Sequence, residues 1–210
     1  MNTGTRLRLA WFTAKSDIVD IPVHVFGRWV RAETAAAVEG SPGVILDVCT
    51  GTGSVLLEYA SRFPGARIVA VDFEQEILDV ARARLENRGF ENLETIAADA
   101  REIPAPTCSV DVANISFGLH ENKRPDRSLI LGECFRVLRP GGSLVVSDYR
   151  EVEGLVRSTL QRLYLLAFEP RWVDELFHGG LEREVAGAGF AIESARADLP
   201  LTRLIVARRL

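Results

Sequence analysis

The stretch from Val44 to Val55, VILDVCTGTGSV, constrains the fold more than any other part of the chain. An apolar run reaches an acid at Asp47, passes through small residues and ends where an amphipathic helical pattern begins. Gly51 and Gly53 lack a Cβ, so the backbone can turn tightly there and a ligand can approach the main chain. Free N–H groups at the start of a helix favour an anionic group. Such turns serve dinucleotides, nucleotides and other adenosyl ligands, or simply pack a helix on a sheet, and the motif alone leaves these alternatives open.

Strand and helix patterns alternate from residue 44 onward. Nearly continuous apolar strands separated by helices are typical of a parallel sheet covered on both faces. The last two apolar segments are joined by a short link, which predicts an antiparallel hairpin. We therefore predict an α/β, Rossmann-like three-layer sandwich with a mostly parallel seven-stranded sheet and an antiparallel C-terminal strand. The predicted strands are Val44–Val48, Arg67–Asp72, Leu93–Asp99, Val110–Phe117, Ser143–Asp148, Phe190–Ala195 and Arg203–Arg208. The predicted helices are Ala32–Val38, Ser54–Phe63, Glu74–Arg88, Arg127–Leu138, Glu151–Phe168 and Leu181–Ala188.

A length of 210 residues suits one domain, so residues 1–210 are predicted to form a single unit with its core in residues 44–210. Residues 150–180 are expected to form a helical segment on the substrate side. Residues 1–43, which contain many large apolar groups, are expected to form an N-terminal helical segment. Two interpretations of that segment stay open: helices packed on the sheet edge, or a lid over a ligand site that carries aromatic side chains and His24.

The charge balance and the cysteines narrow the class of protein. A net charge of −4 gives no overall basic footprint for nucleic acid or anionic lipid. Cys49, Cys108 and Cys134 show no C-x-x-C spacing, which favours a reducing compartment over a disulfide framework or a structural zinc site. The first residues lack the apolar centre of a secretory signal, and no segment has the apolar length needed to span a bilayer. We expect a cytoplasmic protein with no nucleic-acid partner and no stable membrane insertion, and a homo-oligomer stays open.

Three acids fall at the ends of successive predicted strands: Asp47, Asp72 and Asp99. Ligands of open α/β sheets bind outside the carboxyl ends of the strands. Asp72 lies about 20 residues beyond the glycine loop, the spacing at which an acid hydrogen-bonds a ribose diol. Asp99, followed by Ala100, can meet an adenine amino group. Each acid alone is equally explained as a helix cap, but together they indicate an adenosyl ligand.

Four segments, ILDVCTGTGS, AVDFEQEIL, AADAREIP and VLRPGGSLVVSD, resemble the successive motifs of class I S-adenosylmethionine-dependent methyltransferases. The resemblance covers about Val44 to Asp148, and the closing hairpin is similar to the reversed last strand of that family. It implies S-adenosylmethionine as cofactor and methyl transfer as activity. Within the class, ISFGLHE beside VLRPGG is similar to the ubiquinone/menaquinone biosynthesis methyltransferases, which methylate ring carbons.

Two departures from the family pattern matter. Cys49 stands in the first glycine position of the loop, where its small side chain still leaves room for the cofactor. The quinone branch commonly has Arg-Asn where this chain has His120 and Glu121, so the acceptor stays open.

The resemblance also implies roles for single residues. Asp47 and the loop would hold the methionine end, Asp72 the ribose, and Phe73 the adenine face, although Phe73 as an ordinary core residue is an alternative. Phe117 and N-terminal aromatic groups would wall the acceptor. The expected cofactor-binding residues are Asp47, Cys49, Thr50, Gly51, Gly53, Asp72, Phe73, Asp99, Ala100, Asn114 and Ile115.

Methyl transfer from a sulfonium is an in-line displacement with a neutral leaving group, so alignment and water exclusion supply much of the acceleration. An oxygen or carbon acceptor also needs a base. His120 is the first candidate because it directly follows the fourth predicted strand and an unperturbed histidine titrates near pH 6.5; the alternative is a polar loop residue. Tyr149 is the second candidate. Three dispersed histidines do not indicate a metal site, and none is predicted.

The sequence thus predicts an S-adenosylmethionine-dependent methyltransferase with a small, fairly apolar acceptor, aromatic or quinone-like. One alternative is a non-catalytic S-adenosylmethionine-binding regulatory or assembly protein. Another is a nicotinamide-dependent oxidoreductase, against which stand the missing three-glycine fingerprint and the terminal hairpin.

Overall fold

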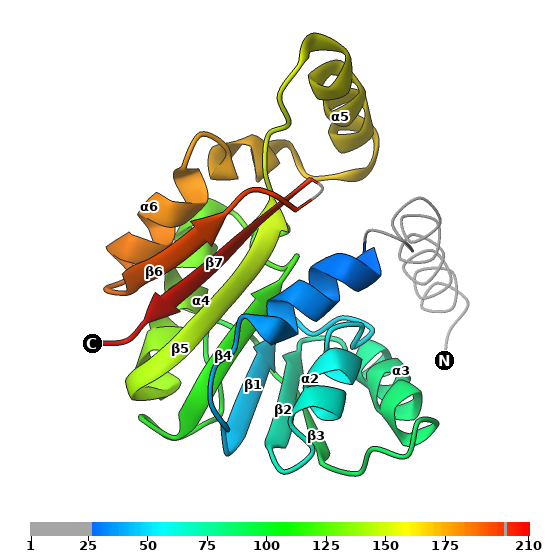
Figure 1. Cartoon of the computed structure of the whole chain (residues 1–210), viewed down its shortest axis with the longest axis vertical. Helices are drawn as coiled ribbons and strands as arrows, with labels where there is room; N and C mark the ends of the chain where they lie inside the picture. The colour runs from blue at the N-terminus through cyan, green and yellow to red at the C-terminus, as the bar shows by residue number, and fades with distance from the viewer. Residues whose placement is uncertain (1–26, 200) are drawn as a thin grey trace.

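A seven-stranded sheet forms the centre of the structure, with helices on both of its faces (Figure 1). The computed structural model describes residues 27–199 and 201–210. The strands are β1 (Val44–Val48), β2 (Arg67–Asp72), β3 (Leu93–Ala97), β4 (Val110–Ser116), β5 (Leu138–Tyr149), β6 (Ala191–Arg196) and β7 (Thr202–Arg208). Their order is β3-β2-β1-β4-β5-β7-β6. Within the described residues, β7 pairs antiparallel with both β5 and β6, and the other pairs are parallel. The predicted mostly parallel sheet with an antiparallel C-terminal strand is confirmed.

Two apolar cores flank the sheet because successive side chains of a strand point to opposite faces. Ile45 of β1 joins the core beneath residues 27–36, α2 (Leu56–Arg62) and α3 (Gln75–Glu86). Leu46, the next residue, joins the core beneath α4 (Arg124–Val137) and α6 (Gly180–Gly187). The sandwich therefore has three layers, as predicted.

The order in which the chain adds strands to the sheet reverses between the parallel neighbours β1 and β4. From β1 the chain adds β2 and β3 on one side, then returns to place β4 on the other side. Asp47 of β1 pairs in register with Asn114 of β4. A crevice at such a switch point, outside the carboxyl ends of the strands, is where open α/β sheets bind ligands. The fold thus brings the loops after β1, β2, β4 and β5 to one edge.

The segment after β5 departs most from the sandwich. Gly154, with φ of 95°, precedes α5 (Leu155–Phe168), which projects beyond the carboxyl edge of the sheet (Figure 1). A 3-10 helix, η1 (Arg171–Leu176), follows where the sequence predicted only a break at Pro170. A small apolar cluster joins Tyr149, Leu165, Val173 and Phe177, and it anchors α5 and η1 to the end of β5.

Several predicted boundaries were wrong by a few residues. The helix expected to begin at Arg127 begins at Arg124, because a proline in its first turn fits there without losing a helical hydrogen bond. The strand expected over Ser143–Asp148 extends from Leu138 to Tyr149, so Pro140-Gly141-Gly142 lies inside it. A Cβ on Gly142 would stand 2.9 Å from the Arg139 carbonyl oxygen, which explains the glycine.

Near the N-terminus the described chain is helical over residues 27–36, beginning before the predicted Ala32–Val38 and ending earlier. Glu33 forms an ion pair with Arg196 of β6 at 2.8 Å, which joins this helix to the sheet edge. Of the proposed lid, His24 and the aromatic residues Trp11, Phe12 and Phe26 fall within residues 1–26, outside the described residues. Trp29 lies in the described helix and is 44% exposed. No helix in the described part of the chain is long and apolar enough to cross a membrane.

Candidate functional site

The loop after β1 is held by hydrogen bonds from its own backbone. The Thr50 N–H donates to the Val71 carbonyl at 3.1 Å, and the Gly51 N–H donates to Asp72 Oδ2 at 2.8 Å. The Thr50 hydroxyl donates to the Asp47 carbonyl at 2.9 Å. These bonds span β1 and β2, so the loop is tied to both strand ends.

The two glycines of this loop have different surroundings. Both lie in the left-handed region, Gly51 with φ of 54° and Gly53 with φ of 72°. A Cβ on Gly53 would stand 2.8 Å from the Cβ of Ala81 on α3, so Gly53 allows the loop to pack against that helix. A Cβ on Gly51 would meet nothing within 4 Å. Gly51 therefore borders open space, where a ligand can approach its backbone.

Cys49, the departure from the family glycine, also has a positive φ of 57°. A Cβ on Gly118, in the loop after β4, would stand 2.6 Å from the Cys49 Cβ. The two loops approach so closely only because position 118 is glycine. Burial raises the pKa of the Cys49 thiol, so it stays protonated and unreactive at neutral pH.

Asp47 is the buried acid of this region. Its Oδ1 accepts a hydrogen bond from Asn114 Nδ2 at 2.6 Å, and the Asn114 Oδ1 accepts one from the Tyr59 hydroxyl at 2.9 Å. Asp47 Oδ2 is buried and has no hydrogen-bond partner among the described residues. Burial raises the pKa of Asp47 to about 7. An unpaired buried carboxylate oxygen fits a ligand that brings a positive charge or an N–H donor.

Asp72 lies beside the loop, as predicted, and also helps to build it. Its two carboxylate oxygens accept the Gly51 N–H at 2.8 Å and the Glu74 N–H at 3.2 Å. Each oxygen keeps a further lone pair for a ligand hydroxyl. The neighbouring Phe73 is 74% exposed, so its interpretation as a core residue was wrong.

The remaining predicted cofactor residues differ in exposure. Asp99 forms an ion pair with Arg101 at 2.6 Å, and the hydrogen bonds from that residue lower the pKa of Asp99. Ala100 packs partly buried against the core beneath α4, and Ile115 has no exposed surface in the same core. Of these residues, Asp99 alone presents a charged group at the surface.

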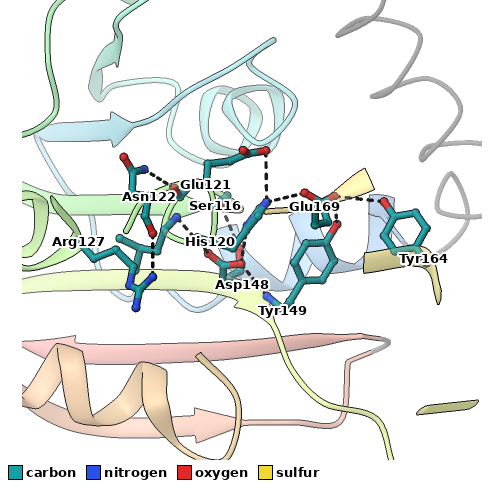
Figure 2. A network of polar contacts seen from close by, with 12 residues as sticks. Ser116, His120, Glu121, Asn122, Arg127, Asp148, Tyr149, Tyr164 and Glu169 are labelled. Atoms are coloured by element: carbon teal, nitrogen blue, oxygen red, sulfur yellow. Dashed lines mark hydrogen bonds and ion pairs between the residues drawn. The ribbon is translucent and has the colours of Figure 1, made fainter. Parts of the chain in front are cut away.

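A second cluster of polar side chains lies at the ends of β4 and β5 (Figure 2). His120 Nδ1 lies 2.8 Å from Asp148 Oδ1, and its Nε2 lies 3.4 Å from Glu169 Oε2. Asp148 Oδ2 accepts the backbone N–H groups of Leu119 and His120, both at 3.1 Å. The Tyr149 hydroxyl donates to Glu169 Oε1 at 3.1 Å. The structure thus brings the two predicted catalytic residues together. Glu169 contacts both of them, and Asp148 contacts the His120 ring.

The charges around His120 set its protonation. Its burial lowers its pKa, but Asp148, Glu121 and Glu169 outweigh that effect and hold the pKa well above 6.5. Burial and the adjacent Glu169 raise the pKa of Tyr149 well above 10, so its phenol stays neutral and acts as a hydrogen-bond donor. The cluster is therefore an imidazolium surrounded by carboxylates at neutral pH.

Three rings form one wall of this cluster. The Phe117 and Tyr149 centroids lie 5.4 Å apart, and those of His120 and Tyr149 lie 4.8 Å apart, in edge-to-face arrangements. Phe117 holds a φ of 54°, unusual for a bulky residue, at the turn that directs the chain from β4 toward His120. Strain of this kind is common where a backbone is shaped around a site.

Sequence reasoning missed three members of the site. Asp148 ends an apolar strand, the same signal that singled out Asp47, so it could have been found. Glu169 precedes Pro170 at the end of a helix and carries no sequence signal. Tyr59, inside α2, showed only an ordinary helical position.

His178, the other histidine of the described residues, does not join the cluster. His178 forms an exposed ion pair with Glu151 at 3.0 Å. One donor atom each from His120, Glu121 and Glu169 lies within 4.8 Å of the others, so these groups have the spacing to hold a metal ion. The ion-pair network around the imidazolium accounts for their positions without one.

Comparisons with known proteins agree with this geometry. Residues 45–142 match the family model described as a methyltransferase domain. A demethylmenaquinone methyltransferase from Thermus thermophilus is 41% identical over 122 residues, covering 58% of this chain and 54% of that protein. One from Deinococcus radiodurans is 34% identical over 143 residues, covering 68% and 58%. The chain spans little more than half the length of these curated relatives. A SAM-dependent methyltransferase from Aquifex aeolicus shares the fold, with a TM-score of 0.72 and 20% identity over 94% of this chain and 98% of that chain.

Proposed function

We propose that the protein is an S-adenosylmethionine-dependent methyltransferase that methylates a small, fairly apolar acceptor, and the match of residues 45–142 to a methyltransferase domain and the shared fold support this proposal. The observation that carries the proposal is the pairing of two different regions at one sheet edge. One has an open glycine backbone and a buried acid with one unpartnered oxygen, and the other has aromatic rings around a histidine. The first region fits a cofactor, and the second fits an acceptor.

The loop after β1 has the features that the methionine end of S-adenosylmethionine requires. Asp47 Oδ2 offers a buried negative charge to a cationic ligand, and the Gly51 backbone borders open space. Asp72 has lone pairs left for a ribose diol, and exposed Phe73 offers a ring face for adenine. When bound, the cofactor supplies a methyl group activated by its sulfonium. The proposed cofactor-binding residues are Asp47, Cys49, Thr50, Gly51, Gly53, Asp72, Phe73, Asp99, Ala100, Asn114 and Ile115.

The acceptor is proposed to be an aromatic, quinone-like ring. The edges and faces of Phe117 and Tyr149 suit a flat apolar ring, and the curated relatives carry the name demethylmenaquinone methyltransferase. By the resemblance, the quinone branch commonly has Arg-Asn where this chain has His120 and Glu121, so we propose that different side chains make the polar contacts to that ring here.

We propose that His120 receives the proton that the acceptor must lose. Asp148 takes the Nδ1 side of the ring, which fixes the imidazole and leaves Nε2 on the side of Glu121 and Glu169. A ring carbon of a reduced quinone becomes nucleophilic when its phenolic hydroxyl gives up a proton, and Nε2 is the atom that would take it. Because the raised pKa of His120 keeps most of it as imidazolium at neutral pH, the base is its minor neutral form, which grows as the pH rises. Tyr149 stays protonated and orients Glu169 through its hydroxyl.

The three cysteines of the described chain form no disulfide, which supports a reducing compartment such as the cytoplasm as the proposed location.

The test is methyl transfer from methyl-labelled S-adenosylmethionine to a short-chain reduced demethylmenaquinone, with simple phenols and catechols assayed beside it. We expect labelled product with the quinol and little with the smaller rings. Product with none of these acceptors, from protein that binds S-adenosylhomocysteine, would contradict the acceptor class and favour a non-catalytic binding protein.

A further inference from the structure

Helix α5 exposes a row of large apolar side chains. Five of them are each more than half exposed, on a helix of 14 residues. Single exposed apolar residues are normal on a protein surface, but a contiguous group marks an interaction site. These residues are Leu155 (85% exposed), Val156 (72%), Leu160 (62%), Leu163 (59%) and Leu166 (75%).

The exposed residues share one face of the helix. At about 100° per residue, the five exposed residues fall within an arc of roughly 140° around the helix axis. The opposite face holds the buried Gln161 and Leu165, and Leu165 packs against Tyr149 in the cluster that anchors the helix. The apolar face therefore points away from the sandwich, where α5 projects (Figure 1). We call these five residues the apolar face of α5.

The charges of α5 are placed on the borders of this face. The helix contains Arg157 and Arg162 and no acidic residue. By the same helical geometry, Arg162 lies beside one border of the apolar face and Arg157 beyond the other. Both are exposed, and Arg162 comes within 3.8 Å of Glu151 in the segment before the helix. Apolar residues between basic borders are the pattern of a helix that lies in a membrane surface.

We propose that the apolar face of α5 docks the protein on the surface of a lipid bilayer. The helix lies in the plane of the interface, its leucines reach the boundary of headgroups and acyl chains, and the two arginines contact lipid phosphates. At about 1.5 Å per residue the helix is roughly 21 Å long, too short to cross a bilayer but long enough to lie along it. The inference rests on the proposed function for its purpose, since an apolar quinone-like acceptor resides in membranes.

The position of α5 links this surface to the acceptor cluster. The helix begins a few residues after Tyr149 and ends directly before Glu169, so both of its ends border the cluster. Leu165 packs on the Tyr149 side chain from the inner face. A helix held at the bilayer surface would thus place the cluster where an acceptor leaves the lipid.

A second copy of the chain fits this face less well. Pairing α5 with α5 would offer Arg157 and Arg162 no acid on the partner helix, and of these two arginines only Arg162 lies near Glu151, in the segment before the helix. Anionic lipid phosphates balance the same arginines. The charge pattern therefore selects the bilayer over self-association.

The experiment is flotation of the full chain with vesicles of phosphatidylcholine and phosphatidylglycerol, without cofactor or acceptor. The wild-type protein should float with the vesicles, more strongly when phosphatidylglycerol is present. The double variant Leu160→Glu/Leu163→Glu should lose about tenfold or more of the vesicle-bound fraction, because two charged side chains enter the interface. Leu129→Glu on α4 is the matched control, since Leu129 is 55% exposed and Leu163 is 59% exposed. That control should bind vesicles like the wild type.

Circular dichroism and S-adenosylhomocysteine binding check that the double variant is folded. A wild-type protein that stays unbound, or a double variant that binds vesicles like the control, would overturn the proposal. Light scattering that shows a wild-type dimer and a monomeric double variant, both of which bind vesicles equally, would also overturn it, because a second copy would then occupy the face. Failure of methyl transfer leaves this result unaffected, because flotation needs neither cofactor nor acceptor.

Discussion

The two halves of the site are built by different means. The proposed cofactor half, made of the loops after β1 and β2, is held by backbone groups, as in the bonds of Gly51 to Asp72 and of Thr50 to Val71. The proposed acceptor half, made of His120, Asp148, Tyr149 and Glu169, is held largely by contacts between side chains of separate segments. A backbone-built half depends on a few glycines and short spacings. A side-chain-built half can change its chemistry while the fold stays the same.

The largest effect is expected from His120→Ala. Loss of a general base costs typically about 10²–10⁴-fold in turnover, whereas the affinity for S-adenosylhomocysteine should stay the same because the cofactor half is untouched. The wild-type rate should rise with pH through the raised pKa of His120, since the neutral imidazole is the active form, and the variant should lose that rise. His120→Asn keeps a polar group beside Asp148 and controls for unfolding. A normal rate for the alanine variant at every pH would remove His120 from the mechanism.

Asp47 predicts a pH effect on the cofactor half. Its pKa is about 7 in the folded protein and near 3.8 when exposed, so the unfolded chain loses this proton first as the pH rises. The ligand-free protein should therefore lose about 4 kcal/mol of stability between roughly pH 4 and pH 7 through this group. Asp47→Asn should remove that loss and weaken S-adenosylhomocysteine binding, as measured by urea unfolding and calorimetry. If the unfolding free energies of the wild type and the Asp47→Asn variant changed equally with pH, Asp47 would not be the group that causes the loss.

The two glycines of the loop give a matched pair. Gly53→Ala should destabilise the protein by about 2–4 kcal/mol, because the new methyl meets Ala81 and the residue keeps a positive φ. Gly51→Ala carries the backbone penalty alone, about 1–2 kcal/mol, but its methyl enters the space proposed for the ligand. Urea unfolding and S-adenosylhomocysteine titration should thus rank the two variants in opposite orders. The same rank in both measurements would argue against a ligand beside Gly51.

Asp72 has the smallest expected effect. Asp72→Ala removes acceptors for two backbone N–H groups in a half-buried position, so about 1–2 kcal/mol of stability should be lost along with affinity for S-adenosylhomocysteine. Asp72→Asn keeps one oxygen and should retain more of the stability than of the affinity. Full affinity in the alanine variant would take Asp72 out of the cofactor site.

The cofactor half was predictable because its signals are local. The apolar run, the acid and the glycines lie within a dozen residues, and the strand register then places Asp47 beside Asn114. The sequence could not show that Asp72 also braces the loop, because that bond joins backbone and side chain across two strands. Nor could the sequence decide whether the Phe73 side chain is buried or exposed, since a residue that directly follows a strand can be either.

The acceptor half was only partly predictable. Position after a strand indicated His120 and Tyr149, but Glu169 is 49 residues from His120 and meets it only through the tertiary fold. The pKa of His120 was also out of reach, because it depends on carboxylates from three segments. Helix α5 was predicted from its apolar spacing, yet the same spacing describes a buried stripe and an exposed one.

The most direct test of the central claim, that the loops after β1 and β2 hold S-adenosylmethionine, is a calorimetric titration. S-adenosylhomocysteine would be titrated into the wild-type protein, with NAD and NADP titrated beside it under the same conditions. The cofactor half as described predicts binding of S-adenosylhomocysteine and of neither nicotinamide cofactor. Binding of NAD or NADP alone, or no heat from S-adenosylhomocysteine, would contradict it.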